Sequence, residues 1–145
     1  MVLTQFHTAS AAETIALGHR LAPELKGVVL LIGNLGAGKT TLVKGIAEGL
    51  QAAREEEVSS PTFTLIHEYG DPPLVYHIDL YRLDTEREVE SLGLEDLFST
   101  GRLVLIEWGE RFPRLMPLPR TEIEITAQQD DSRIIVWSME TTNLK

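Results

Sequence analysis

The segment Gly33-Asn34-Leu35-Gly36-Ala37-Gly38-Lys39-Thr40-Thr41 decides the fold, and it directly follows the apolar run Val28-Val29-Leu30-Leu31-Ile32. It matches the pattern GxxxxGK[ST], in which a buried strand leads through a glycine-rich loop into a helix. Glycines let the backbone wrap closely around a phosphate group, and the positive end of the helix dipole points at the same anion. The alternative, a glycine-rich turn without a ligand, is disfavoured by the strand before the loop and the Lys-Thr pair after it. We therefore predict that the chain binds a nucleoside triphosphate.

The residues of this segment have separate expected roles. Lys39 is placed to reach the β- and γ-phosphates as a point charge, and the Thr40 hydroxyl is placed to bind the Mg²⁺ ion that accompanies the nucleotide. The residues expected to surround the nucleotide phosphates are Asn34, Leu35, Gly36, Ala37, Gly38, Lys39, Thr40 and Thr41.

Length and composition bound the class of protein. The 145 residues fit one domain, which we expect to span residues 1–145, and they leave no room for a second substrate domain. A hydrophobic content of 43%, without an apolar run of membrane-spanning length, is typical of a soluble protein. Residues 1–8 lack the basic flank and apolar core of a signal peptide, and the chain has no cysteine, so we expect a cytoplasmic location.

The charge balance argues against direct binding to nucleic acid. The 13 basic and 22 acidic residues leave a formal net charge of −9, which opposes tight binding to phosphate backbones. Any nucleic-acid role should therefore be indirect. Arg111, Arg114 and Arg120 could form a local basic patch, but arginines spread among prolines are more typical of a solvated loop.

Periodicity and turn residues predict the order of the elements. Ser10 and Glu13 have the spacing of a capping box, so a first helix is expected over residues 10–22. Strands are predicted at residues 28–32, 63–66, 74–78 and 103–106, helices at residues 39–50 and 85–98, a charged surface connection at residues 54–57, and a closing hairpin around residues 123–136. The second and third of these strands would form an antiparallel hairpin. The pattern predicts an α/β fold: a three-layer P-loop NTPase-like domain with a mixed, mainly parallel central sheet.

Two acidic residues stand at the ends of apolar strands. Asp79 follows residues 74–78 and Glu107 follows residues 103–106, where parallel strands would bring both side chains to the carboxyl edge of the sheet. A nucleotide hydrolase needs a carboxylate near its metal ion and a group that orients the attacking water. We assign Glu107 to the metal ion and Asp79 to the water, and the opposite allocation stays open. With Lys39, these acids form the predicted catalytic set. His77 is either a catalytic base or a hydrogen-bonded core histidine.

A further motif, Ser60-Pro61-Thr62-Phe63, resembles a nucleotide-sensing switch. Its hydroxyls could reach a γ-phosphate or its Mg²⁺, while Pro61 limits the conformations of the loop. A plain turn before a strand is the competing interpretation. Trp108 follows Glu107 directly and either covers the site or packs in the core.

Four motifs in a fixed order carry a family resemblance. They are Gly33-Asn34-Leu35-Gly36-Ala37-Gly38-Lys39-Thr40-Thr41, Ser60-Pro61-Thr62-Phe63-Thr64, His77-Ile78-Asp79-Leu80-Tyr81-Arg82 and Ile106-Glu107-Trp108. The chain resembles the TsaE-type family of P-loop proteins, the bacterial ATPase subunit required for tRNA threonylcarbamoyladenosine formation. The resemblance runs from the first helix to Trp108, and the remaining residues match in pattern only.

The resemblance implies a function and assigns roles to residues. The subunit would bind ATP and Mg²⁺, hydrolyse ATP slowly alone, and join a pair of threonylcarbamoyltransferase subunits that modifies adenosine 37 of tRNA. It would meet tRNA only through that complex, and hydrolysis would reset the partner. Thr40 and Glu107 would bind Mg²⁺, Asp79 would be essential, and residues 60–63 would act as the switch. Trp108 would belong to a required motif.

Three other functions compete with this interpretation. A GTPase needs an NKxD element, and the chain has only two asparagines, Asn34 and Asn143, and no DxxG switch. A small-molecule kinase could use the arginines after Trp108 as a lid, but the chain is short for a lid and an acceptor pocket. A binding module that ATP merely orders would need no catalysis.

Overall fold

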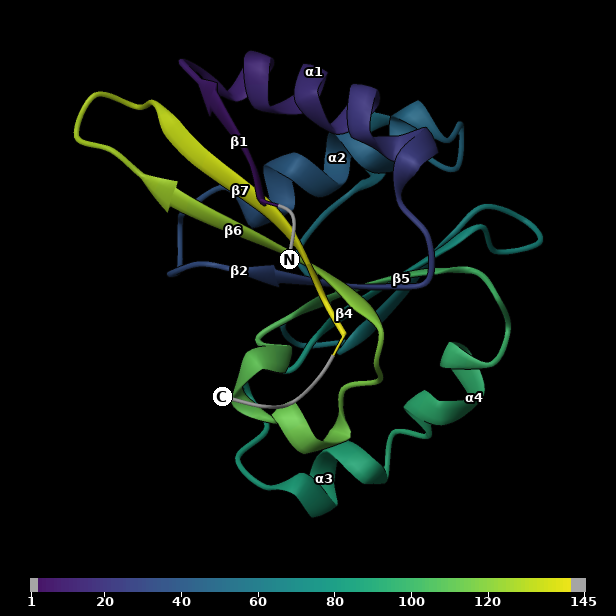
Figure 1. The fold of residues 1–145 in the computed structure, drawn as a ribbon. Helices are drawn as coiled ribbons and strands as arrows, with labels where there is room; N and C mark the ends of the chain where they lie inside the picture. The colour runs from purple at the N-terminus through teal and green to yellow at the C-terminus, as the bar shows by residue number, and fades with distance from the viewer. Residues whose placement is uncertain (1–2, 142–145) are drawn as a thin grey trace.

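The computed structural model describes residues 3–141, which contain seven strands and four α-helices (Figure 1). The strands are β1 (Leu3–Thr8), β2 (Val28–Ile32), β3 (Ile66–Tyr69), β4 (Val75–Asp79), β5 (Leu103–Glu107), β6 (Arg120–Ala127) and β7 (Arg133–Glu140). The helices are α1 (Ala11–Leu21), α2 (Lys39–Gly49), α3 (Glu86–Glu90) and α4 (Leu94–Phe98). Within these residues, no helix combines the length and the apolar character needed to cross a membrane.

All seven strands belong to one sheet, in the order β1-β7-β6-β2-β5-β4-β3. Strand β2 pairs in parallel with β5 and β6, and β4 pairs in parallel with β5, so the centre of the sheet is parallel. Both edges are antiparallel, through the β3–β4 and β6–β7 hairpins and the pairing of β1 with β7. The predicted α/β fold with a mixed sheet is confirmed.

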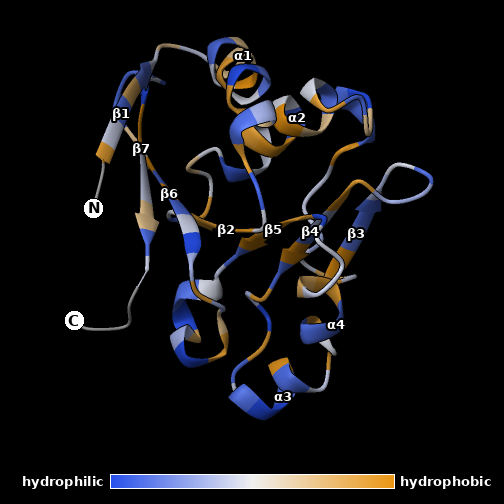
Figure 2. Cartoon of the chain, turned by 45° about the vertical axis from the view of Figure 1, so that its right-hand side comes forward, coloured by the Kyte–Doolittle hydropathy of each residue, from blue (hydrophilic) through white to orange (hydrophobic). Residues whose placement is uncertain are grey.

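Helices cover both faces of the sheet and produce the three layers (Figure 2). Helices α1 and α2 lie over one face, and α3 and α4 lie over the other. The apolar core is divided in the same way, with Leu42 and Ile46 of α2 in one cluster and Val89 of α3 and Leu94 of α4 in the other. The central strands β2, β4 and β5 are largely buried, as expected for parallel strands covered on both faces, and they are mainly apolar apart from His77, Asp79 and Glu107.

Helix α1 crosses α2 at a distance that only glycine allows. A Cβ atom on Gly45 would lie 2.1 Å from the Ile15 carbonyl oxygen, and a Cβ atom on Gly18 would lie 2.7 Å from the Leu42 carbonyl oxygen. Both distances are below van der Waals contact, so the crossing depends on these two missing side chains.

The predicted start of α1 is confirmed. The Glu13 backbone N–H donates to Ser10 Oγ at 3.1 Å, while the Glu13 carboxylate accepts a hydrogen bond from the Ala9 N–H at 2.8 Å. Strand β1, which precedes this cap, was not predicted from the sequence. Its side chains are mostly exposed, and it is held by pairing with β7, whose sequence lies more than 120 residues away.

Two predicted elements have different bounds in the structure. The helix expected over residues 85–98 is two short helices, because Gly93 adopts a left-handed conformation (φ 71°) between α3 and α4. The strand expected at residues 63–66 begins only at Ile66, because the Leu65 N–H donates to the Pro61 carbonyl oxygen at 2.6 Å and closes a turn. The antiparallel hairpin itself is confirmed.

Candidate functional site

A cavity of about 320 Å³ lies at the carboxyl ends of the parallel strands β4 and β5, beside the start of α2. It brings together the glycine-rich loop, the switch motif and both acidic residues singled out in the sequence. Its lining residues are Leu35, Gly36, Gly38, Lys39, Thr40, Thr41, Ser60, Thr62, Asp79, Glu107, Trp108 and Arg133. Ligands bind α/β folds at this edge of the sheet.

The glycine-rich loop and α2 give the cavity a positive rim. Gly36 and Gly38 have left-handed backbones, with φ of 78° and 111°, which side chains rarely adopt. Gly38 is the N-cap of α2, so the unpaired N–H groups and the dipole of an 11-residue helix start at the cavity. Asn34 and Ala37 line a neighbouring cavity of about 410 Å³, which shares Leu35 and Trp108 with the first.

Lys39 is held inside the site rather than in solvent. Its side chain is 5% exposed, and its Nζ donates to the Gly33 carbonyl oxygen at 2.7 Å. The same Nζ lies 3.9 Å from the ring centroid of Trp108. Burial lowers the pKa of Lys39, against the opposing effect of the carboxylates of Glu107, Glu110 and Asp79. The nearby carboxylates offset only part of the cost of burying the Lys39 charge, so an anionic ligand would stabilise it further.

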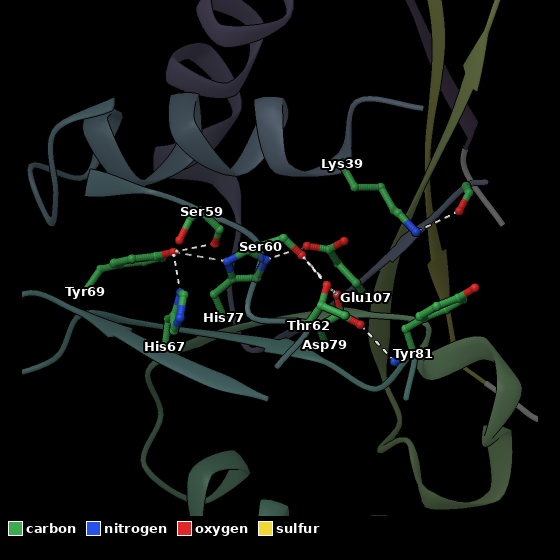
Figure 3. Close-up of polar contacts among 11 residues, drawn as sticks. Lys39, Ser59, Ser60, Thr62, His67, Tyr69, His77, Asp79, Tyr81 and Glu107 are labelled. Atoms are coloured by element: carbon green, nitrogen blue, oxygen red, sulfur yellow. Dashed lines mark hydrogen bonds and ion pairs between the residues drawn. The ribbon is translucent and has the colours of Figure 1, made fainter. Parts of the chain in front are cut away.

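Asp79 holds the switch motif against the sheet (Figure 3). The side chain is 2% exposed, and its Oδ2 accepts hydrogen bonds from Ser60 Oγ at 3.1 Å and Thr62 Oγ1 at 3.0 Å. Its Oδ1 accepts the Tyr81 backbone N–H at 2.8 Å. Of the other two switch residues, Pro61 is buried and Phe63 is 80% exposed, with the Arg82 guanidinium over its ring.

Glu107 lies beside Asp79, because the two residues are partners in the parallel register of β4 and β5. It is 3% exposed, and its Oε2 lies 2.5 Å from Nε2 of His77. His77 is fully buried and is not among the residues that line the cavity. Of its two predicted roles, the geometry favours the hydrogen-bonded core histidine.

Trp108 lines the cavity and has a left-handed backbone (φ 68°). It is half-buried and packs against Tyr81, with 5.1 Å between ring centroids, as well as against the Lys39 ammonium group. Both interpretations from the sequence are met in part, because Trp108 lines the cavity and also packs against the core cluster beneath the sheet.

Sequence reasoning missed Arg133. This residue begins β7, lines the cavity, and donates from Nε to the Ala37 carbonyl oxygen at 2.7 Å. It is 96 positions from Ala37 in the chain, so no local pattern links the two residues.

The three arginines after Trp108 do not form a basic patch. Arg111 lies near Asp84, Arg114 pairs with Glu86, and Arg120 pairs with Glu122. Arg120 is buried at the start of β6, so the prediction of a solvated loop is wrong at that position, because strand pairing carries the residue into the sheet.

The donor set of the cavity fits a magnesium ion. Thr40, Asp79 and Glu107 offer a hydroxyl and two carboxylates, and Mg²⁺ prefers oxygen ligands. Across residues 3–141, no three acidic or histidine side chains form a cluster that could hold a metal ion alone. Mg²⁺ commonly takes one or two protein carboxylates and completes its shell with substrate phosphates and water.

Comparisons with known proteins agree on one family. Residues 8–135 match the family described as threonylcarbamoyl adenosine biosynthesis protein TsaE. A Bacillus subtilis protein named tRNA threonylcarbamoyladenosine biosynthesis protein TsaE is 42% identical, covering 92% of this chain and 84% of its own. A Nostoc protein of the same name is 48% identical, covering 77% of this chain and 71% of its own.

A solved structure supports the same assignment. The crystal structure of Bacillus subtilis YdiB superimposes with a TM-score of 0.77 and 34% identity, covering 98% of this chain and 88% of that one. The family match, the curated relatives and the shared fold lead to one conclusion: this chain belongs to the TsaE family of threonylcarbamoyl adenosine biosynthesis proteins.

Proposed function

We propose that this protein is an Mg²⁺-dependent ATPase subunit that supports the threonylcarbamoyladenosine modification at position 37 of tRNA by resetting a partner pair of threonylcarbamoyltransferase subunits. One observation carries the ATPase part of the proposal: Lys39, Thr40, Asp79 and Glu107 converge on a single cavity at the N-terminus of α2. The pathway comes from the family to which the chain belongs. The cytoplasmic location stays a prediction.

Binding would begin with the phosphate groups of ATP. The loop N–H groups and the α2 dipole provide donors for the β-phosphate, and Lys39 exchanges the Gly33 carbonyl oxygen for phosphate oxygens. This exchange favours ATP binding, because Lys39 has already lost water on burial and gains a negatively charged partner. Thr40 and Glu107 would hold Mg²⁺, which supplies positive charge next to the phosphate oxygens.

Hydrolysis would use Asp79 to orient water. A water molecule donating a hydrogen bond to the Asp79 carboxylate would attack the γ-phosphorus, and the bond to the β,γ-bridging oxygen would break to leave ADP and phosphate. One water proton would stay on the phosphate, and the other would pass through Asp79 to solvent. Asp79 also holds Ser60 and Thr62, so the same carboxylate would link the reacting phosphate to the switch motif. This link offers the partner a way to sense ATP turnover.

The charge of the chain supports an indirect role on tRNA. A net charge of −9 disfavours gripping a phosphate backbone, and the arginines after Trp108 face carboxylates. Exposed apolar side chains next to the cavity, Leu35 and Phe63, suit contact with a protein partner instead.

The deciding experiment measures ATP hydrolysis by the purified protein alone, and with the transferase pair and unmodified tRNA. Lys39→Ala and Glu107→Ala are measured in parallel. Strong stimulation by the partners that both variants abolish would support the proposal. Tight ATP binding without stimulation would support the binding module, and phosphate transfer to a metabolite would support a kinase.

A further inference from the structure

Behind the candidate metal ligand lies a chain of polar groups, centred on the buried side chains of His77 and Tyr69, that the proposed mechanism does not use (Figure 3). His77 Nε2 contacts Glu107 Oε2 at 2.5 Å, and His77 Nδ1 contacts the Tyr69 hydroxyl at 3.2 Å. The Tyr69 hydroxyl also lies 3.4 Å from the Ser59 carbonyl oxygen and 3.5 Å from Nδ1 of His67. The chain therefore runs from the edge of the cavity to the residue before the switch motif.

We propose that His77 is a positioning residue for Glu107, and that Tyr69 links this positioning to the switch motif. The inference rests on the proposed function, since it assigns Glu107 to Mg²⁺. His77 reaches the metal site only through Glu107, because the imidazole is fully buried and does not line the cavity.

Burial makes both contacts of His77 important. A polar group without partners in an apolar interior is costly, and here each ring nitrogen has one partner. Neighbouring residues of β4 and β5, such as Ile78 and Leu105, are also fully buried, so water does not compete for these bonds. The imidazole is therefore locked in one orientation.

The direction of the hydrogen bonds follows from the donors available. Burial raises the pKa of Tyr69 to about 12, so its hydroxyl keeps one proton to donate. In the neutral tautomer that donates from Nε2 to the Glu107 carboxylate, Nδ1 of His77 is an acceptor for the Tyr69 proton. The Ser59 carbonyl oxygen can accept only that same proton. The two acceptors compete for one proton, so movement of Ser59 would change the strength of the hydrogen bond from Tyr69 to His77.

The consequence for Glu107 is a fixed carboxylate. His77 holds Oε2, so the Glu107 carboxylate that lines the cavity would turn less freely when it binds a metal ion. Histidine and carboxylate groups behind metal ligands orient them in this way, and losing such a partner typically weakens metal binding by about 10- to 100-fold.

The test compares nucleotide binding with and without Mg²⁺. Calorimetry would measure the affinity of a non-hydrolysable ATP analogue in Mg²⁺ and in EDTA, for the whole protein and three variants. His77→Leu removes both bonds, His77→Gln keeps an amide N–H for Glu107, and Tyr69→Phe removes only the hydroxyl. Tyr76→Phe is the matched control, because Tyr76 lies next to His77 on β4 but packs in the other core cluster from Tyr69.

We expect His77→Leu to reduce the affinity gained from Mg²⁺ by about 10-fold or more, with the affinity in EDTA unchanged. His77→Gln should restore most of this gain, and Tyr69→Phe should reduce it by about threefold. A purely structural role would lower the melting temperature and weaken binding equally in both buffers. The Tyr69→Phe variant keeps the ring, so it tests the inference even where His77→Leu folds poorly.

Two outcomes separate this inference from the proposed function. In the first outcome, Mg²⁺ raises the nucleotide affinity of the unaltered protein, and it raises the affinities of His77→Leu and Tyr69→Phe by the same factor. The positioning role is then wrong and the proposed function stands. If the unaltered protein binds no nucleotide in either buffer, the proposed function fails and the inference fails with it.

Discussion

Asp79 offers the sharpest test of whether the site is catalytic. Asp79→Ala would remove the acceptor for three hydrogen bonds, from Ser60 Oγ, Thr62 Oγ1 and the Tyr81 N–H. Bonds to a charged acceptor contribute about 1.5–3 kcal/mol each when buried, but Ser60 is exposed and Thr62 is half-buried, so water replaces part of that contribution. The carboxylate is also buried next to Glu107, and its removal relieves repulsion between the two acids.

The net stability loss should therefore be small. We expect about 1–2 kcal/mol, which corresponds to a fall in melting temperature of about 3–8 °C for a chain of this size. Asp79→Asn should lose less, because its amide oxygen keeps an acceptor for the Tyr81 N–H. Both variants should remain folded at 25 °C, so changes in turnover can be attributed to the site.

Turnover separates the two functional interpretations. If Asp79 orients water, both variants should lose about 10²- to 10⁴-fold of the partner-stimulated ATPase rate. The assay follows phosphate release with the transferase pair and unmodified tRNA, at saturating Mg²⁺ and ATP. Unchanged turnover in Asp79→Asn, with a normal melting temperature, would refute the catalytic assignment and leave Asp79 as an anchor for the switch.

Three further predictions concern separate parts of the structure. Arg133→Ala removes the bond to the Ala37 carbonyl oxygen, and we expect ATP binding by calorimetry to weaken about 5- to 10-fold. Gly45→Ala places a Cβ atom 2.1 Å from the Ile15 carbonyl oxygen, and we expect a loss of about 3 kcal/mol in urea unfolding. The pKa of Lys39 is lowered from 10.5 by burial, so the free folded protein releases this proton more readily than the unfolded chain. The contribution of Lys39 to the free energy of unfolding should therefore rise with pH, from its pKa in the folded protein up to about 10.5. ATP affinity should fall over the same pH range, because Lys39 loses its charge.

Matched variants decide each of these three cases. Arg54→Ala alters an exposed arginine outside the cavity, and an equal loss of ATP affinity there would contradict a specific role for Arg133. Lys44→Ala also lies in α2, and a urea midpoint as low as that of Gly45→Ala would show that the close crossing is not the cause. Lys39→Met removes the titrating group. If its stability depends on pH in the same way as that of the unaltered protein, the pH prediction is wrong.

Local patterns predicted the centre of the molecule well. The strand, glycine-rich loop and helix of residues 28–49 depend on backbone freedom at glycine and on an apolar run, both readable over a few residues. The cap of α1 is equally local. Asp79 and Glu107 could be placed at one edge because parallel strands end together there.

The features that local patterns missed have two causes: distant partners for β1 and Arg133, and a left-handed glycine at residue 93. Strand β1 is stabilised by pairing with β7, and the expected helix at residues 85–98 is interrupted by the left-handed backbone of Gly93. Arg133 reaches the glycine-rich loop across the sheet, from a strand whose sequence showed only alternating hydrophobicity. Its role depends on where β7 packs, which no spacing within the chain reveals.

The sequence by itself determined the strand, glycine-rich loop and helix of residues 28–49, the α/β class and the candidate acids, because each depends on neighbouring residues and on the shared edge of parallel strands. Only the tertiary structure decided how those residues are held. The bond from His77 to Glu107 joins two strands, 30 positions apart, and the bonds from Ser60 and Thr62 to Asp79 join a loop to a strand. Such contacts are set by packing across the sheet, which brings together polar groups that are distant in the sequence.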